Sequence, residues 1–339
     1  MTFHRAHPYP PTRYMGSKEA LLGPLWEVIG ALPGHSVLDL FSGSGVVAHM
    51  LKGHGRPVIA NDYMAMAATF ARAMVANDGA TLDADAVEAL LAPAPDSDGF
   101  VSKTFSGLYY DDADTRLIDA VRANLRCLGD PALRAVGMSA LIRACLKKRP
   151  RGIFTYTGMR YDDGRRDLRL GVADHIREQA ALINRAVFAS GQPCEAHWGD
   201  AMTTDLRADI VYIDPPYFSP LSDNEYVRRY HFLEGLARDW QGVDIQAHTK
   251  TRKFASYPTP FKTAQGAAAA FEALFRRHAD SAIVVSYASN ALPDRDTLAA
   301  LLRTVKRRVE VVEIDHRYSV GTQKAGQKNA VREYVFVGG

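Results

Sequence analysis

Residues 36–45 read SVLDLFSGSG, a short apolar run that ends in a glycine-rich turn. The residues that follow, VVAHMLKG at 46–53, have the apolar spacing of a helix that ends at Gly53. A second apolar run, RPVIAND at 56–62, and an amphipathic stretch at 63–77 repeat the pattern. The order strand, turn, helix, strand, helix predicts a parallel sheet covered by helices.

Beyond residue 77 the pattern changes. The segment APAPDSDG at 92–99 indicates a loop, and helical spacing then follows at 111–128, at 131–148 and in a segment that ends near residue 189. Strand patterns return at 195–200, 209–217, 281–287, 309–318 and 332–338. We therefore predict an α/β catalytic domain made of residues 1–80 and 195–339, interrupted by a mostly helical insertion over 81–194.

Composition narrows the class of protein. The chain has 339 residues, of which 47% are hydrophobic and 23% charged, as is ordinary for a globular protein. We expect no membrane partner, because no run approaches the roughly 20 apolar residues that span a bilayer. The N-terminal residues lack an export signal, and the three cysteines are far apart, so we expect a cytoplasmic protein without disulfides. The 11 histidines show no metal-binding spacing, so we expect no metal site.

Two strand ends suggest a ligand site. Gly43 and Gly45 let the backbone approach a ligand closely, at a turn that leads into a helix N-terminus. Asp62 ends the second strand, where a carboxylate can accept hydrogen bonds from both hydroxyls of a ribose. The glycines could instead serve only a tight turn, and Asp62 could cap the next helix. Together the two features favour a nucleoside ligand, since ligands bind beyond the carboxyl ends of parallel strands.

A third strand ends in DPPY at 214–217, a sequence suited to methylation of an exocyclic amine. The lone pair of such a nitrogen is delocalised into the ring, and two acceptors on its hydrogens help to localise it. Asp214 and the carbonyl of Pro215 can supply them, and Pro215 and Pro216 hold both in place. Tyr217 can stack on a base flipped out of a duplex. The alternative, a proline-rich strand exit with a capping acid, leaves the order of the four residues unexplained.

The segments RYMGSK at 13–18, VLDLFSGSG at 37–45, ND at 61–62 and DPPY at 214–217 occur in the order found in Dam-like adenine-N6 DNA methyltransferases. The chain resembles this family over most of residues 12–339. The resemblance implies S-adenosyl-L-methionine as cofactor and a Rossmann-like seven-stranded methyltransferase sheet. It also implies a flipped adenine in double-stranded DNA as substrate, and the helical insertion as target-recognition domain.

The resemblance also implies roles for individual residues. Tyr14 and Lys18 would contact the cofactor, with Lys18 near its carboxylate. The methionine end would be lined by Asp39, Phe41, Gly43 and Gly45. Asp62 would hold the ribose, and Asp214 would lie between cofactor and adenine. Asp200 would face the adenine ring of the cofactor, or would only form a turn after its strand. Many members of the family have Trp at the position of Tyr14 and Gly at that of Ser17.

Positive charge is concentrated between Arg143 and Arg169, where nine Lys or Arg residues face three Asp in the sequence. Aromatic residues and glycines lie among these charges, as in a loop that touches a polyanion, although such a run can also be a solvated face. We expect a phosphate-contacting cluster without acids, made of Lys147, Lys148, Arg149 and Arg151. We expect groove contacts from the following loop, at Arg160, Arg165 and Arg166.

Several alternatives stay open at this point. The enzyme could methylate cytosine N4 or RNA instead, or the chain could be a non-catalytic DNA-binding protein that has only kept the fold. Residues 219–240, a polar and aromatic stretch, could form a loop that closes on the base or a surface helix. The DNA sequence recognised, a restriction endonuclease as partner, and the choice between monomer and dimer are not determined.

Overall fold

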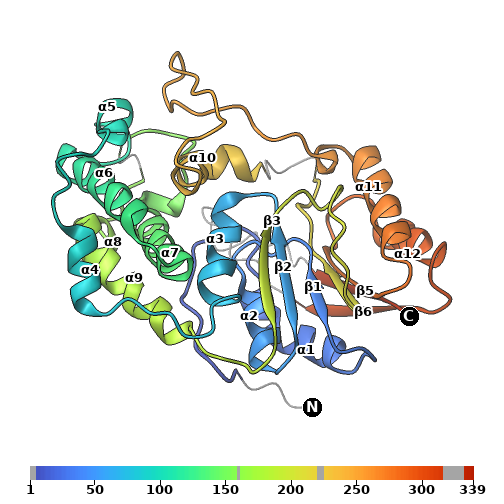
Figure 1. Cartoon of the computed structure of the whole chain (residues 1–339). Helices are drawn as coiled ribbons and strands as arrows, with labels where there is room; N and C mark the ends of the chain where they lie inside the picture. The colour runs from blue at the N-terminus through green and yellow to red at the C-terminus, as the bar shows by residue number, and fades with distance from the viewer. Residues whose placement is uncertain (1–4, 159–160, 220–224, 316–331) are drawn as a thin grey trace.

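The computed structural model describes residues 5–158, 161–219, 225–315 and 332–339. Its centre is a seven-stranded sheet in the order β3-β2-β1-β4-β5-β7-β6 (Figure 1). The strands are β1 Val37–Asp39, β2 Val58–Asp62, β3 Cys194–Trp198, β4 Ile210–Ile213, β5 Ala282–Ala288, β6 Val309–Asp315 and β7 Arg332–Gly338. β7 runs antiparallel to β5 and β6, and the other described pairs are parallel. The predicted fold class is confirmed; residues 316–318, predicted to extend β6, lie outside the described residues.

The register of the central strands places their carboxyl ends at one edge of the sheet. Asp39 of β1 lies beside Ala60 of β2 and Tyr212 of β4. From β1 the chain continues to β2, which pairs with one side of β1, while β4 pairs with its other side. Such a change of direction is where open α/β sheets bind their ligands. The strand ends at Asp62 and at residue 214 therefore meet that of β1.

Helices cover both faces of the sheet because neighbouring residues of each buried strand point to opposite sides. Val37 belongs to the apolar core shared with α1 (Leu22–Gly30), α2 (Val46–Gly53) and α3 (Ala65–Met74). Leu38 belongs to the core on the other face, which α11 (Ala264–Arg277) and α12 (Arg295–Arg303) complete. The apolar residues of β1 are therefore buried on both faces of the sheet.

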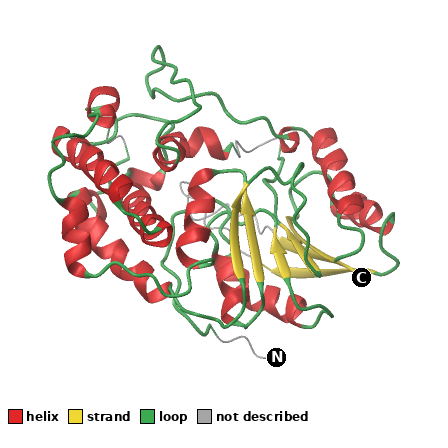
Figure 2. Ribbon diagram, in the orientation of Figure 1, coloured by secondary structure: helices red, strands yellow, loops and turns green. Residues whose placement is uncertain are grey.

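A block of helices follows α3 and lies beside the sheet (Figure 2). Its members are α4 Ala84–Leu91, α5 Phe100–Phe105, α6 Asp112–Cys127, α7 Pro131–Lys148, α8 Arg166–Arg169 and α9 Val172–Ala186. The predicted helices at 111–128 and 131–148 are present as α6 and α7, which begin after the capping side chains of Asp111 and Asp130. α7 packs against α3 and α9, and their buried side chains belong to one core with the sheet. The division into domains at residues 81 and 194 stays a prediction.

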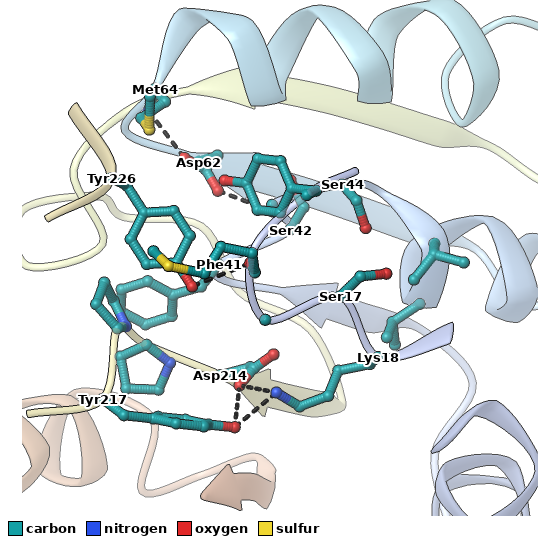
Figure 3. Close-up of a pocket in the computed structure, with 18 of the residues that line it drawn as sticks. Ser17, Lys18, Phe41, Ser42, Ser44, Asp62, Met64, Asp214, Tyr217 and Tyr226 are labelled. Carbon is teal, nitrogen blue, oxygen red and sulfur yellow. Dashed lines mark hydrogen bonds and ion pairs between the residues drawn. The ribbon is translucent and has the colours of Figure 1, made fainter. Parts of the chain in front are cut away.

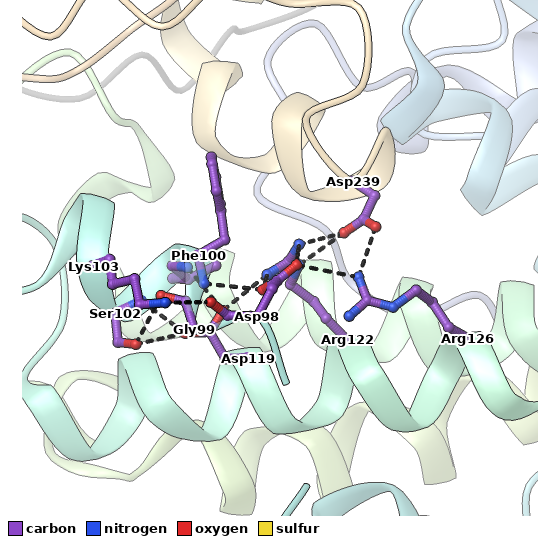
Figure 4. A network of polar contacts seen from close by, with 10 residues as sticks. Asp98, Gly99, Phe100, Ser102, Lys103, Asp119, Arg122, Arg126 and Asp239 are labelled. Carbon is purple, nitrogen blue, oxygen red and sulfur yellow. Dashed lines mark hydrogen bonds and ion pairs between the residues drawn. The ribbon is translucent and has the colours of Figure 1, made fainter. Parts of the chain in front are cut away.

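An ion-pair network joins this block to α10 (Tyr226–Ala237) (Figure 4). Arg122 of α6 is buried and lies within 3.1 Å of Asp98, 2.8 Å of Asp119 and 2.5 Å of Asp239. Asp239 follows α10 with a positive φ of 53°, and Arg126 also pairs with it at 2.8 Å. Because a buried guanidinium needs such partners, the network fixes the end of α10 against the helical block.

None of the helices in the described part of the chain is both long and apolar enough to cross a membrane.

Candidate active site

A cavity of about 320 Å³ opens where the carboxyl ends of β1, β2 and β4 meet (Figure 3). The structure brings most of the predicted catalytic and cofactor residues to its wall, namely Tyr14, Lys18, Asp39, Phe41, Gly43, Asp62, Asp214, Pro215, Pro216 and Tyr217. These residues come from the N-terminal segment and from three strand ends that are far apart in sequence. The convergence of four sequence motifs on one cavity is what a binding or catalytic site requires.

The glycine-rich turn shapes the wall next to β1. Gly43 has a φ of +50°, and a Cβ atom there would lie 3.1 Å from the ring of Tyr14. Gly45 has a φ of +81° and precedes α2; a Cβ atom there would lie 3.0 Å from the hydroxyl of Tyr9. Gly45 is not among the residues that line the cavity, so its structural contribution is to the turn itself. The turn lets Tyr14 pack closely and points the start of α2 at the cavity.

Asp62 joins two turns of the cavity wall. Its carboxylate accepts hydrogen bonds from the backbone N–H groups of Gly43 and Met64, both at 2.8 Å. Burial raises the pKa of Asp62 to about 7, although these two bonds favour the ionised form. A carboxylate has about four acceptor positions, so these bonds leave room for a ligand as well. Asp62 therefore holds the glycine-rich turn in place whether or not it also binds a ribose.

Asp39 and Ser42 leave polar atoms in the cavity wall that the protein itself does not satisfy. Both carboxylate oxygens of Asp39 and the hydroxyl oxygen of Ser42 are buried, and no described residue donates to them with normal hydrogen-bond geometry; the backbone N–H groups of Ala48 and Phe41 approach Asp39 only closely enough to favour its ionised form. Burial raises the pKa of Asp39 well above its usual range, and the charges of Asp214 and Asp62 raise it further. Buried acceptors are costly unless a donor reaches them, so this wall suits a ligand that brings hydrogen-bond donors or positive charge.

Lys18, Asp214 and Tyr217 form a compact polar cluster at the end of β4 (Figure 3). The Nζ of Lys18 lies 2.8 Å from Oδ1 of Asp214 and donates to the hydroxyl of Tyr217 at 2.6 Å. That hydroxyl lies 2.9 Å from Oδ1 of Asp214. Burial raises the pKa of Asp214 to about 6, and Lys18 opposes the rise. Burial alone would lower the pKa of Lys18, but Asp214 and Glu333 more than offset it and the pKa is raised.

Glu333 belongs to this cluster, and the sequence did not reveal it. Its side chain is completely buried, and its Oε1 lies 2.6 Å from the hydroxyls of Tyr217 and Ser286 and 3.5 Å from Nζ of Lys18. The only signal in the sequence is an acid at the start of the apolar stretch REYVFVG at 332–338. The contact arises because β7 pairs with β5, with Glu333 opposite Ala288.

Helix α10 forms one side of the cavity. It belongs to residues 219–240, for which the sequence left two alternatives open. Within 219–240 the helix covers Tyr226–Ala237, while 220–224 lie outside the described residues. Tyr226 lines the cavity and donates to the carbonyl of Met15 at 3.2 Å. Tyr230 accepts from the N–H of Met15 at 2.9 Å and stacks on Tyr14, with ring centroids 5.4 Å apart. α10 thus packs against the N-terminal motif and holds it over the cavity.

Asp200 lies apart from the predicted site. It is exposed, is not among the residues that line the cavity, and its Oδ1 accepts from the N–H of Met202 at 2.9 Å. This hydrogen bond is what a residue in the turn after β3 makes. Its predicted contact with the cofactor stays a prediction.

The cluster of basic residues at the end of α7 differs from the prediction. Lys148 pairs with Asp114 at 2.8 Å, and Lys147 lies 3.5 Å from Asp167. The sequence 147–151 contains no acid, but folding brings acids from α6 and α8 next to the two lysines, whose contact with phosphates stays a prediction. Arg149 is fully buried and donates to the carbonyls of Ile153, Tyr156 and Gly158. It cannot also reach a phosphate, so its assignment to DNA is corrected.

The other basic residues lie at the surface. Arg151 is exposed, and its guanidinium lies 3.9 Å from the ring centre of Tyr161. Arg165 and Arg166 are exposed and pair with Asp163 and Glu178. Arg160 lies outside the described residues. Surface ion pairs are weak, so these guanidinium groups can exchange their partners for phosphate or base edges.

The described residues contain no group of three or more His, Cys, Asp or Glu side chains arranged to hold a metal ion.

Comparison with known proteins gives a consistent match. The family model for D12 class N6 adenine-specific DNA methyltransferases matches residues 14–291. The chain is 27% identical over 337 residues to the type II methyltransferase M2.HphI of Haemophilus parahaemolyticus, and the alignment covers 95% of this chain and 96% of that protein. It is 24% identical over 296 residues to the type II methyltransferase M.NlaIII of Neisseria lactamica, with 82% and 84% covered. It is also 22% identical over 346 residues to the modification methylase LlaI of Lactococcus lactis subsp. lactis, with 95% and 51% covered.

Proposed function

The chain belongs to the D12 class N6 adenine-specific DNA methyltransferases, and from this premise we propose that it transfers the methyl group of S-adenosyl-L-methionine to N6 of an adenine flipped out of double-stranded DNA. The observation that carries the proposal is the Lys18–Asp214–Tyr217 cluster at the end of β4, in the same cavity as Gly43 and Asp62. One cavity then holds both the amine-binding and the cofactor-binding motif.

The cavity fits S-adenosyl-L-methionine by charge. Its wall contains the buried carboxyl groups of Asp39 and Asp62 and the partly buried one of Asp214, together with the single buried amine of the described wall residues, that of Lys18. The cofactor carries a sulfonium and an ammonium, which would offset the unsatisfied acceptors of Asp39. Asp62 would bind the ribose with its remaining acceptor positions. When bound, the cofactor supplies an electrophilic methyl group.

Lys18 already has hydrogen-bond partners in the protein, and these limit how it can bind the cofactor. Its amine pairs with Asp214 and touches the hydroxyl of Tyr217. An ammonium donates three hydrogen bonds, so Lys18 can bind the cofactor carboxylate only by sharing its donors with Asp214. We propose that Lys18 bridges the two, and that it thereby links cofactor binding to the position of the catalytic acid.

At the amine site, Asp214 and the carbonyl of Pro215 would accept hydrogen bonds from the two N6 hydrogens. The acceptors localise the nitrogen lone pair along the line of attack, and the prolines keep them fixed before the reaction. Tyr217 would stack on the flipped adenine and offset part of the unstacking free energy. Because the amine itself attacks the methyl group, the reaction needs no covalent enzyme intermediate.

DNA recognition is proposed for the helical block. Arg151, Arg165 and Arg166 are exposed on the segment that joins α7 to α9 and are the described candidates for contacts with phosphates or bases. Lys147 and Lys148 are partly exposed and would have to leave their acidic partners first. The hydrogen bond from the N–H of Phe154 to the carbonyl of Arg229, at 2.8 Å, connects the same segment with α10 at the cavity.

The relatives' names suggest the biological setting. Two of them are called type II methyltransferases and one a modification methylase, so we propose that this chain protects DNA against a restriction endonuclease with the same recognition sequence. The amino-acid composition supports a cytoplasmic location, where such DNA lies.

The test is mass analysis of nucleosides. Purified protein is incubated with S-adenosyl-L-methionine and unmethylated genomic DNA, which is then digested. The proposal predicts N6-methyladenine with the wild-type protein, and almost none with Asp214→Ala. N4-methylcytosine as the product, or methylated RNA with unmodified DNA, would contradict the proposal.

A further inference from the structure

Glu333 is a buried acid that has no role in the reaction proposed above. It is completely buried on β7, at the strand end next to the amine site. Its Oε1 lies 2.6 Å from the hydroxyl of Tyr217, closer than the 2.9 Å that separates this hydroxyl from Oδ1 of Asp214. Two carboxylates therefore compete for one hydroxyl group of the DPPY motif.

A phenol hydroxyl has one hydrogen and can donate it to only one acceptor. The Tyr217 hydroxyl already accepts from Lys18 at 2.6 Å, so within this cluster its own hydrogen can go to Asp214 or to Glu333 but not to both. Shorter hydrogen bonds to an ionised acceptor are the stronger ones, which favours Glu333. If the hydrogen goes to Glu333, Asp214 receives a hydrogen bond from Lys18 alone within this cluster and keeps more of its acceptor strength.

We propose that Glu333 is a positioning residue of the methyl-transfer reaction: it takes the hydroxyl hydrogen of Tyr217 and so leaves the carboxylate of Asp214 available to the target amine. The inference rests on the proposed function of the Asp214 site. The hydrogen bond also fixes the Tyr217 ring at both ends, because its backbone follows two prolines. Ser286 donates to the same oxygen of Glu333 at 2.6 Å and holds the carboxylate in place.

Glu333→Gln gives the sharpest perturbation. The amide keeps the size of the side chain but can donate to the Tyr217 oxygen, which turns the hydroxyl hydrogen towards Asp214. Single-turnover methylation should slow about 10- to 100-fold, by analogy with the loss seen when a residue that orients a metal ligand through a hydrogen bond is replaced. The dissociation constant for S-adenosyl-L-methionine should rise less than the rate falls, because Glu333 touches Lys18 only at 3.5 Å but holds the Tyr217 hydroxyl at 2.6 Å.

A double-mutant cycle separates this role from a merely structural one. In Tyr217→Phe there is no hydroxyl hydrogen to redirect, so adding Glu333→Gln should slow methylation by less than about threefold further. Glu313→Gln is the matched control, because Glu313 is a carboxylate on the neighbouring strand β6 that does not line the cavity. This control should methylate at the wild-type rate.

Three results would overturn the inference: a wild-type rate for Glu333→Gln, an equal loss whether or not Tyr217→Phe is also present, or a loss of cofactor affinity as large as the loss of rate. Thermal melting checks folding, and if Glu333→Gln does not fold, Glu333→Asp replaces it in the same cycle.

Asp214→Ala is measured in parallel. If Asp214→Ala methylates DNA at close to the wild-type rate, the proposed active site itself is wrong; if only Glu333→Gln is unimpaired, the proposed function stands and this inference fails.

Discussion

Replacement of Asp214 by alanine should abolish most of the activity without unfolding the protein. In the proposed reaction Asp214 is one of two fixed acceptors for the amine hydrogens. Removal of one preorganised electrostatic contact costs about 3 to 4 kcal/mol in the transition state, or roughly a hundred- to a thousandfold in rate. The Pro215 carbonyl and the stacking of Tyr217 remain, so a residual rate should be measurable.

The folded state should tolerate this change. Burial raises the pKa of Asp214 from 3.8 to about 6, so the folded protein holds the ionised acid less readily than the unfolded chain does. A shift of this size corresponds to about 3 kcal/mol of stability, which is lost as the pH rises from the unfolded pKa through the folded one. Alanine removes this penalty, but it also removes the nearest partner of the buried Lys18 and leaves that amine with Glu333 at 3.5 Å. The two effects oppose each other, so above pH 7 the free energy of unfolding should change little.

The assay is single-turnover transfer of a labelled methyl group to duplex DNA, with enzyme in excess. Cofactor affinity and thermal melting are measured on the same preparation. Asp205→Ala is the matched control, since Asp205 is an exposed acid in the loop before β4 and does not line the cavity. A folded Asp214→Ala enzyme within about threefold of the wild-type rate would refute the reasoning, because the expected loss is at least about a hundredfold.

Other predictions concern the base site, pH, DNA contacts and stability. Tyr217→Ala should weaken the flipped state by about 1 to 3 kcal/mol and Tyr217→Phe by less; equal fluorescence of 2-aminopurine at the target position with wild type and Tyr217→Ala would exclude this role. Because burial raises the pKa of Asp214 to about 6, kcat/KM should fall as the pH drops below that value, and a flat profile between pH 5 and 8 would contradict an ionised acceptor. Arg151→Ala should weaken binding to all duplexes and lower the salt slope by about one, whereas Arg149→Ala should lower the melting temperature; an unchanged slope with Arg151→Ala would remove this residue from the DNA interface. Arg122→Ala should lower the free energy of unfolding by about 3 kcal/mol, since it leaves three carboxylates without their shared partner, and a loss below about 1 kcal/mol in urea denaturation would show that the network adds little.

The sequence predicted the sheet and most of the residues that gather at the cavity because their signals are local. An apolar run that ends in Asp39, Asp62 or Asp214 marks a strand and its carboxyl end at once. The parallel order then brings these ends together. Helix α7 was predicted with its observed bounds, since Asp130 caps it and a proline occupies its first turn.

What the sequence did not predict depends on contacts between distant segments. Glu333 reaches Tyr217 and Lys18 because β7 inserts between β5 and β6, a pairing that no local pattern specifies. Lys148 meets Asp114 only after α6 and α7 have packed against each other. Arg149 looks like its basic neighbours in sequence, and only the fold shows that it is buried among backbone carbonyls. The number of basic residues in a segment predicts that the segment binds a polyanion, but it does not predict which of the side chains can reach one.

Long-read sequencing of DNA from cells that express the protein tests the central claim most directly, because it reports the modified base together with its sequence context. Cells without other adenine methylation would carry either the wild-type gene or the Asp214→Ala variant. The account predicts N6-methyladenine within one short sequence motif in the wild-type culture, and loss of that signal in the variant. Modification at cytosine, no modification by a folded wild-type protein, or an unchanged adenine signal with Asp214→Ala would contradict it.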